Sequence, residues 1–135
     1  MSRASGGPEA GAREPAEIAT AVIEAINSRD PARLSRLLDA DAEVVTGRST
    51  HTGAEAIVAW AGKQFDHLQR RYAIDELRTA GNAVLALGRV QHVWTETEEV
   101  ADSSPVALEL KLSNGQLSSL KVHDDPTKAR AIFES

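Results

Sequence analysis

The sequence predicts an α+β fold in which helices near the N-terminus pack on one face of a mainly antiparallel sheet. Apolar residues recur at helical spacing in three segments before residue 68, whereas strand-forming runs fill most of residues 71 to 123. Two of these runs flank Asn114-Gly115, a dipeptide that favours the type I′ turn of a β-hairpin. Helices followed by consecutive strands are typical of α+β domains.

Cap and turn signals place the individual elements. Pro15 suits the first turn of a helix, and Asp30-Pro31 is typical of an N-cap followed by the first helical residue. Thr52 and Glu55 are spaced as a capping box, which predicts a helix that continues to about residue 67. The expected elements are helices over 16–28, 31–38 and 53–67, strands over 42–46, 71–79 and 83–97, a hairpin over 106–125 with its turn at 113–116, and a last helix from 126.

The hairpin turn also predicts which side chains share a face of the sheet. With Asn114-Gly115 as the turn, uninterrupted pairing places Glu109 opposite Leu120. One face then carries a row of apolar residues, namely Val106, Leu108, Leu110 and Leu112. The other face carries a mixed set, namely Glu109, Lys111, Leu120 and Val122. Since both faces are partly apolar, we expect both to be covered, one of them by a second subunit.

Length and composition limit the classes of protein to which the chain can belong. Its 135 residues suit one domain over residues 15–135, and the Gly-, Ala- and Ser-rich residues 1–14 read as a disordered tail. The net charge of -5 leaves no basic surplus for phosphates, so nucleic-acid binding is not expected. The chain has no cysteine, no apolar run near the ~20 residues of a membrane span and no signal-peptide core. We therefore expect a cytoplasmic protein.

Three stretches resemble the nuclear transport factor 2-like superfamily, and within it the SnoaL-like and ketosteroid isomerase-like branch. They are AVIEAINSRDPARLSRLLDADAEVV, THTGAEAIVAW and SNGQLSSLKVHDDP. The resemblance covers roughly residues 16–133. It implies a cone-shaped curved sheet wrapped around the N-terminal helices, with an apolar interior open at one end. Members include isomerases, dehydratases, polyketide cyclases and domains that only bind or associate, so the fold alone does not give the function.

Matched position by position, the active site of the isomerase is only partly present. Its tyrosine falls near Val22 and its aspartate base near Val44, and a valine can transfer no proton. Its protonated aspartate matches Glu109, which the resemblance places inside the cone with Leu120 and Val122. The resemblance therefore does not decide whether the chain is an enzyme.

Glu109 and His92 are the two catalytic candidates. In an apolar cone the pKa of Glu109 would rise, and a neutral carboxylic acid donates a hydrogen bond to a ligand oxygen. The alternative is that Glu109 is solvated or pairs with Lys111, two residues along on the same face. His92 shares a strand face with Trp94 and could carry a proton, unless that face is the outer surface of the sheet.

The rest of the predicted ligand site is apolar apart from one lysine. It comprises Trp60, Phe65, Trp94, Lys111, Leu120 and Val122. Trp60 and Phe65 are most simply core residues of their helix, although the resemblance implies that such residues also form the cavity wall. No metal-ligand spacing occurs, so we expect neither a metal nor a cofactor.

Three functions therefore remain, and the first is favoured because two catalytic positions are valines. The first is a domain that binds a small apolar, oxygen-bearing molecule in the cone. The second is an enzyme of the isomerase, dehydratase or cyclase type that uses Glu109 with a neighbouring His or Lys. The third is a non-catalytic dimerisation domain. A homodimer is expected in any case through the outer row of Val106, Leu108, Leu110 and Leu112, which would otherwise form an exposed apolar patch.

Overall fold

The computed structural model describes residues 14–65 and 67–134 and confirms the α+β fold class. Of the predicted tail, residues 1–13 lie outside the described residues, and Glu14 is the N-cap of the first helix. The helices are α1 (Pro15–Ser28), α2 (Pro31–Leu37), α3 (Ala54–Ala61) and α4 (Pro126–Glu134). The strands are β2 (Leu38–Val45), β3 (Thr50–Thr52), β4 (Gln64–Phe65), β5 (Leu68–Ala80), β6 (Ala83–Trp94), β7 (Val100–Ser113) and β8 (Gln116–His123).

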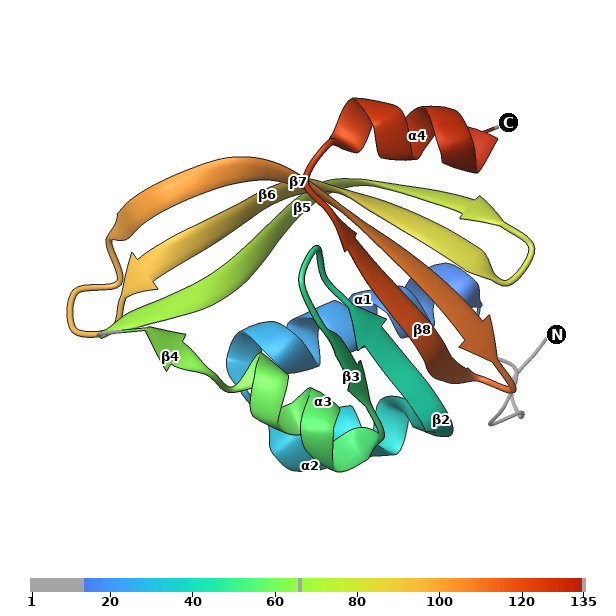
Figure 1. Ribbon diagram of the computed structural model, residues 1–135, viewed down its shortest axis with the longest axis horizontal. Coiled ribbons are helices and arrows are strands. Elements are labelled where there is room, and N and C mark those ends of the chain that lie inside the picture. Colours follow the sequence, from blue (N-terminus) through green and yellow to red (C-terminus); the bar gives the residue numbers. More distant parts are fainter. Residues whose placement is uncertain (1–13, 66, 135) are drawn as a thin grey trace, which may run out of the picture.

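Within the described residues the strands form one sheet in the order β3-β2-β8-β7-β6-β5-β4. Only the β2–β8 pair is parallel, and every other neighbouring pair is antiparallel. Figure 1 shows α1, α2 and α3 on one side of the curved sheet and α4 on the other. We call the side that faces α1 the inner face and the side that faces α4 the outer face. No helix among the described residues is long and apolar enough to cross a membrane.

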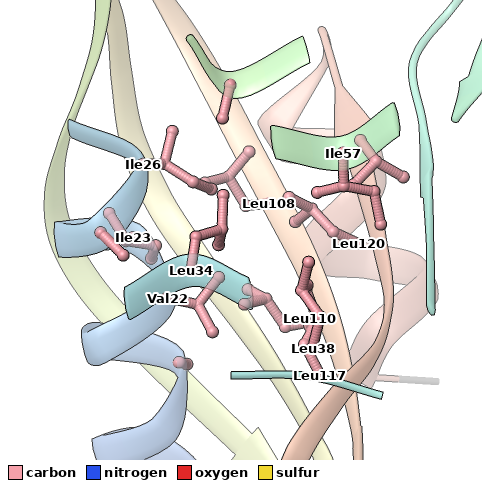
Figure 2. Close-up of a cluster of buried hydrophobic side chains, with 14 of the residues drawn as sticks. Val22, Ile23, Ile26, Leu34, Leu38, Ile57, Leu108, Leu110, Leu117 and Leu120 are labelled. Carbon is pink, nitrogen blue, oxygen red and sulfur yellow. The ribbon is translucent and has the colours of Figure 1, made fainter. Parts of the chain in front are cut away.

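The inner face and the three N-terminal helices enclose the main core. Figure 2 shows side chains from α1, α2 and α3 converging on Leu108, Leu110, Leu117 and Leu120 of β7 and β8. These four leucines are fully buried, as are Val22 of α1 and Ile57 of α3. Burying one such leucine stabilises the fold by about 1.5–3 kcal/mol.

Asn27 joins α1 to the edge of the sheet. Its side-chain amide donates to the Tyr72 carbonyl oxygen at 2.9 Å, and its carbonyl oxygen accepts from the Tyr72 N–H at 2.9 Å. Next to it, Asp30 caps α2 by accepting from the Arg33 N–H, as predicted. The Asn-x-x-Asp motif therefore fixes the end of one helix to β5 and starts the next helix.

A one-residue bulge at Ser118 makes the predicted register of the hairpin wrong beyond the turn. Ser113 pairs with Gln116 as expected, but the pairing then skips Ser118, whose hydroxyl donates to the Lys111 carbonyl oxygen at 3.0 Å. Glu109 consequently pairs with Lys121, not with Leu120. A slip of one residue exchanges the faces of a strand.

The bulge corrects the predicted positions of both hairpin faces. Leu120 and Val122 turn to the same side as Leu108 and Leu110, and that side is the inner face. Glu109 pairs with Leu85, which belongs to the apolar cluster under α4, so Glu109 lies on the outer face. The prediction that Glu109 points into the cone with Leu120 and Val122 is wrong.

The row predicted to form a dimer interface lies in the core. Its four members are Val106, Leu108, Leu110 and Leu112, and they are at most 7% exposed. They pack against the N-terminal helices, so they form no exposed patch. The homodimer itself stays a prediction, but this row cannot be its contact surface.

The third helix also differs from expectation. Thr52 ends β3 and pairs with Glu43, and the N-cap of α3 is Gly53, with no side-chain capping bond. The helix ends at Ala61, with Gly62 as its C-cap, and the chain continues into β4. Strand pairing therefore overrides the capping box, and Phe65 belongs to a strand instead of a helix.

A second bulge, at Asp75, bends β5 around α1. The pairing with β6 shifts between Ile74 and Glu76, opposite Gly88. A Cβ atom at Gly88 would overlap the carbonyl oxygen of Ala73. Glycine is thus required here because the two backbones approach too closely for any side chain.

Helix α4 covers part of the outer face. Ala129 and Phe133 pack on Leu85, Leu87 and Ala107. Ion pairs fasten the helix to β5, because Arg130 binds Glu76 and Arg78 binds both Glu76 and Glu134. The hydrogen bond from Arg78 holds the pKa of Glu76 below its usual value, so this carboxylate keeps its charge in mildly acidic solution.

We predict that Leu110→Ala destabilises the protein by about 2–5 kcal/mol, because it leaves a cavity in the core. Lys111→Ala, one residue along on the outer face, should change the free energy of unfolding by less than about 0.5 kcal/mol. Urea unfolding of both variants measures the contrast. Equal effects would contradict the assignment of the two faces.

We predict that Gly88→Ala destabilises the protein by about 1–3 kcal/mol or more, since the new methyl group overlaps the β5 backbone. The matched control is Gly47→Ala, whose Cβ would have no neighbour nearer than 4.0 Å. Thermal unfolding should show a lower melting temperature for the first variant only. An unchanged melting temperature for Gly88→Ala would show that the bend tolerates a side chain.

Candidate functional site

Three strands bring Arg70, His92 and Asp102 into one row on the inner face. Arg70 pairs with His92 across β5 and β6, and His92 pairs with Asp102 across β6 and β7. Directly paired residues share a face. The next row toward the core is Tyr72, Val90 and Ser104, of which Tyr72 and Val90 belong to the core cluster. His92 therefore lies on the inner face and not on the outer surface of the sheet.

His92 and Asp102 form a close pair of titratable side chains. The imidazole Nδ1 lies 3.3 Å from a carboxylate oxygen of Asp102. The side chain of His92 is 31% exposed and that of Asp102 is 63% exposed, so the pair lies where the inner face meets solvent. A carboxylate beside Nδ1 can fix the orientation of the imidazole ring, which leaves Nε2 as the ring nitrogen available to a ligand.

Arg70 links this row to α3. Its guanidinium lies 4.4 Å from the centre of the Trp60 ring, a cation–π distance, and its Nη2 donates to the Trp60 carbonyl oxygen at 2.7 Å. The Tyr72 ring centre is 6.0 Å from the same guanidinium. Burial raises the pKa of the Tyr72 phenol, and the Arg70 charge partly opposes that rise. Tyr72 therefore stays protonated in neutral solution.

Glu109, the leading candidate from the sequence, has a different partner. Its carboxylate oxygen lies 3.1 Å from His123 Nε2 on the outer face. The side chain of Glu109 is 22% exposed and that of His123 is 30% exposed. His92 lies on the inner face, so the structure does not bring the two predicted catalytic residues together.

The predicted ligand-lining residues are scattered. Trp60 and Leu120 are buried in the core, and Val122 packs against it. Trp94 is 43% exposed at the end of β6, and Lys111 is exposed on the outer face. The side chain of Phe65 lies outside the described part of the structure.

Arg70, Tyr72 and Asp102 were not among the site residues predicted from the sequence. Asp102 falls between the predicted strand 83–97 and the predicted hairpin from 106, but it belongs to the first part of β7. Counting back from the Gly81-Asn82 turn would have placed Tyr72 opposite Gln91, because the bulge at Asp75 shifts the register by one residue. Residues 70–78 (RRYAIDELR) do not alternate regularly between polar and apolar, so the sequence carries no clear signal of which face each side chain takes.

The arrangement can serve two kinds of chemistry. The row itself carries a cation, an imidazole and a carboxylate. Its neighbours toward the core include the aromatic Tyr72 and the apolar Val90. Such a surface can hold an apolar molecule and offer hydrogen bonds to its oxygen atoms. In the parts of the chain that the structure describes, no three His, Cys, Asp or Glu side chains gather as metal ligands.

We predict a coupling free energy of about 0.5–1 kcal/mol between Glu109 and His123, because the pair is partly buried. A double-mutant cycle of Glu109→Gln and His123→Gln, measured by urea unfolding, gives this value. The control cycle pairs Glu109→Gln with Lys111→Gln and should give a value near zero. Coupling to Lys111 instead would restore the alternative partner proposed from the sequence.

Comparison with solved structures identifies the fold. A putative SnoaL-like polyketide cyclase from Shewanella putrefaciens has a TM-score of 0.71 at 15% identity, covering 91% of this chain and 98% of that one. An NTF2-like protein of unknown function from Cytophaga hutchinsonii has a TM-score of 0.67 at 16% identity, covering 89% and 95%. TerC, co-crystallised with polyporic acid, has a TM-score of 0.69 at 17% identity, covering 90% and 98%.

These similarities show a common NTF2-like, ketosteroid isomerase-like fold and no more, because the identities are low. No curated protein sequence matches significantly. A family model described as SnoaL-like domain matches residues 19–119, most of the chain. The family resemblance seen in the sequence is thereby confirmed, and the chain belongs to the SnoaL-like domain family.

Proposed function

We propose that the chain binds a small apolar, oxygen-bearing molecule against the inner face of its sheet, with His92 as the polar anchor. The observation that carries this proposal is the cross-strand row of Arg70, His92 and Asp102 beside aromatic and apolar side chains. Asp102 orients the imidazole from Nδ1. His92 replaces Glu109 as the anchor, since Glu109 lies on the opposite face.

The named relatives support the same class of ligand. One is a putative SnoaL-like polyketide cyclase, and TerC was co-crystallised with polyporic acid. Polyketides carry oxygen atoms on a carbon skeleton, which suits an apolar surface with one or two hydrogen-bonding groups. Their low identity to this chain makes them a guide to which compounds to test first.

Thermal unfolding with a panel of polyketide-, steroid- and terpene-like ketones tests the proposal. A ligand present at 100 times its dissociation constant should add about 2.7 kcal/mol to the free energy of unfolding. His92→Gln should lower this gain by about 1 kcal/mol, because one hydrogen bond to the ligand weakens. His123→Gln, the same substitution on the outer face, should leave the gain unchanged.

Two outcomes would count against the proposal. If no compound stabilises the wild type, the alternative of an association domain without a ligand gains support. If a compound stabilises the wild type and only His123→Gln reduces the gain, the site lies on the outer face.

A second candidate function, proton transfer, rests on the His92–Asp102 pair. A histidine held by a carboxylate can remove a proton from carbon next to a ketone. In deuterated water, a bound ketone would then exchange its α-hydrogens faster with wild-type protein than with His92→Gln. Equal exchange rates would leave binding as the function.

A further inference from the structure

A second cleft lies away from the inner-face row, where the ends of α1, α2 and α3 meet. It has a volume of ≈ 260 Å³, near the lower end of ordinary small-molecule pockets. Its walls are mostly apolar side chains with one cation and one carboxylate. They comprise Ala25, Arg29, Asp30, Pro31, Leu34, Val58, Ala61 and Gly62. The cleft thus has the apolar body and few polar groups of a ligand site.

Arg29 is the unusual residue of this cleft. Its backbone has φ 55, a left-handed conformation that a non-glycine residue rarely adopts. Its Nε is buried and meets no hydrogen-bond acceptor among the described residues. Its Nη2 makes a long bond, 3.3 Å, to the Lys63 carbonyl oxygen. The guanidinium is therefore poorly satisfied by the protein around it.

The charge balance around the cleft favours an anion. Arg70 is near enough to Arg29 that its charge, together with the larger effect of burial, lowers the pKa of Arg29. The carboxylate of Asp30 also lines the cleft, but it already accepts a hydrogen bond from the Arg33 N–H as the cap of α2. Arg29 is thus the cation that lines the cleft, with the charge of Arg70 nearby, and the one carboxylate of the lining is committed to its helix.

We infer that this cleft binds a small carboxylate with an apolar body, whose carboxylate pairs with the Arg29 guanidinium. An arginine presents several N–H donors in a plane, which matches the two oxygens of a carboxylate. The apolar side chains of Leu34, Val58 and Ala61 take the rest of the ligand. On binding, Nη2 exchanges its long hydrogen bond to the Lys63 carbonyl oxygen for one to the ligand carboxylate.

Titration with benzoate, followed by nuclear magnetic resonance, tests this inference. Benzoate should shift the Arg29 Nε–Hε signal and the amide signals of Ala61 and Gly62 in a saturable way. Arg29→Gln should weaken binding about tenfold or more, the loss expected for a charge-assisted hydrogen bond. Arg33→Gln is the matched control, because Arg33 is exposed, pairs with Glu24 and does not line the cleft.

Two further experiments separate the effect of the ligand's charge from the effect of its fit in the cleft. Benzamide, the neutral analogue, should bind about tenfold more weakly than benzoate if the guanidinium recognises charge. Val58→Phe fills the cleft without altering a charge and should abolish the benzoate shifts. Equal binding of benzoate to wild type and Arg29→Gln, equal affinity for benzamide, or shifts confined to the His92 row would each overturn the inference. Failure of the inner-face ligand panel would not affect it, since the two sites share no lining residue.

Discussion

The bulge at Ser118 is the constraint on which the rest of the structure depends. By adding one residue to β8, it turns Leu120 and Val122 to the same side as Leu108 and Leu110. Without it, each face of the hairpin would mix apolar and polar side chains, and neither could close the core beneath α1. The Ser118 hydroxyl supports the bulge locally by bonding the Lys111 carbonyl oxygen. Because of the same bulge, Glu109 lies on the outer face, on the opposite side of the sheet from Leu120.

The bulge at Asp75 has the corresponding effect on the candidate site. It shifts the β5–β6 pairing by one residue, so that Arg70 meets His92 and Tyr72 meets Val90. With uninterrupted pairing, Tyr72 would meet Gln91 and the row on the inner face would be different. The bend at Gly88, which lets β5 curve around α1, belongs to the same irregularity. Curvature of the sheet and composition of the site therefore have one structural origin.

This dependence explains how much could be predicted from the sequence. Most signals that act within a few residues held, since the Asn114-Gly115 turn, the Asp30 cap and the helix after Asp125-Pro126 are all present. The Thr52–Glu55 capping box did not, because Thr52 pairs in β3. The family was also correct, because its motifs lie at such local positions. The predicted side of the sheet for Glu109 was wrong, since the bulge at Ser118 reverses the side chains of β8 that follow it. His92 was predicted, but its partner Asp102 lies in a part of β7 that was not predicted to be a strand.

The two faces of the sheet are consequently suited to different roles. Part of the outer face is already covered, because α4 packs on Leu85 and Leu87 and is fastened by ion pairs to Glu76 and Arg78. What remains of that face near the hairpin is polar, with Glu109, Lys121 and His123 side by side. A dimer formed there would have to desolvate these charged side chains. A dimer through Leu85 and Leu87 would first require α4 to leave. The inner face carries the row of Arg70, His92 and Asp102 beside the core residues Tyr72 and Val90, and this combination of polar and apolar side chains is the reason to propose the ligand site there.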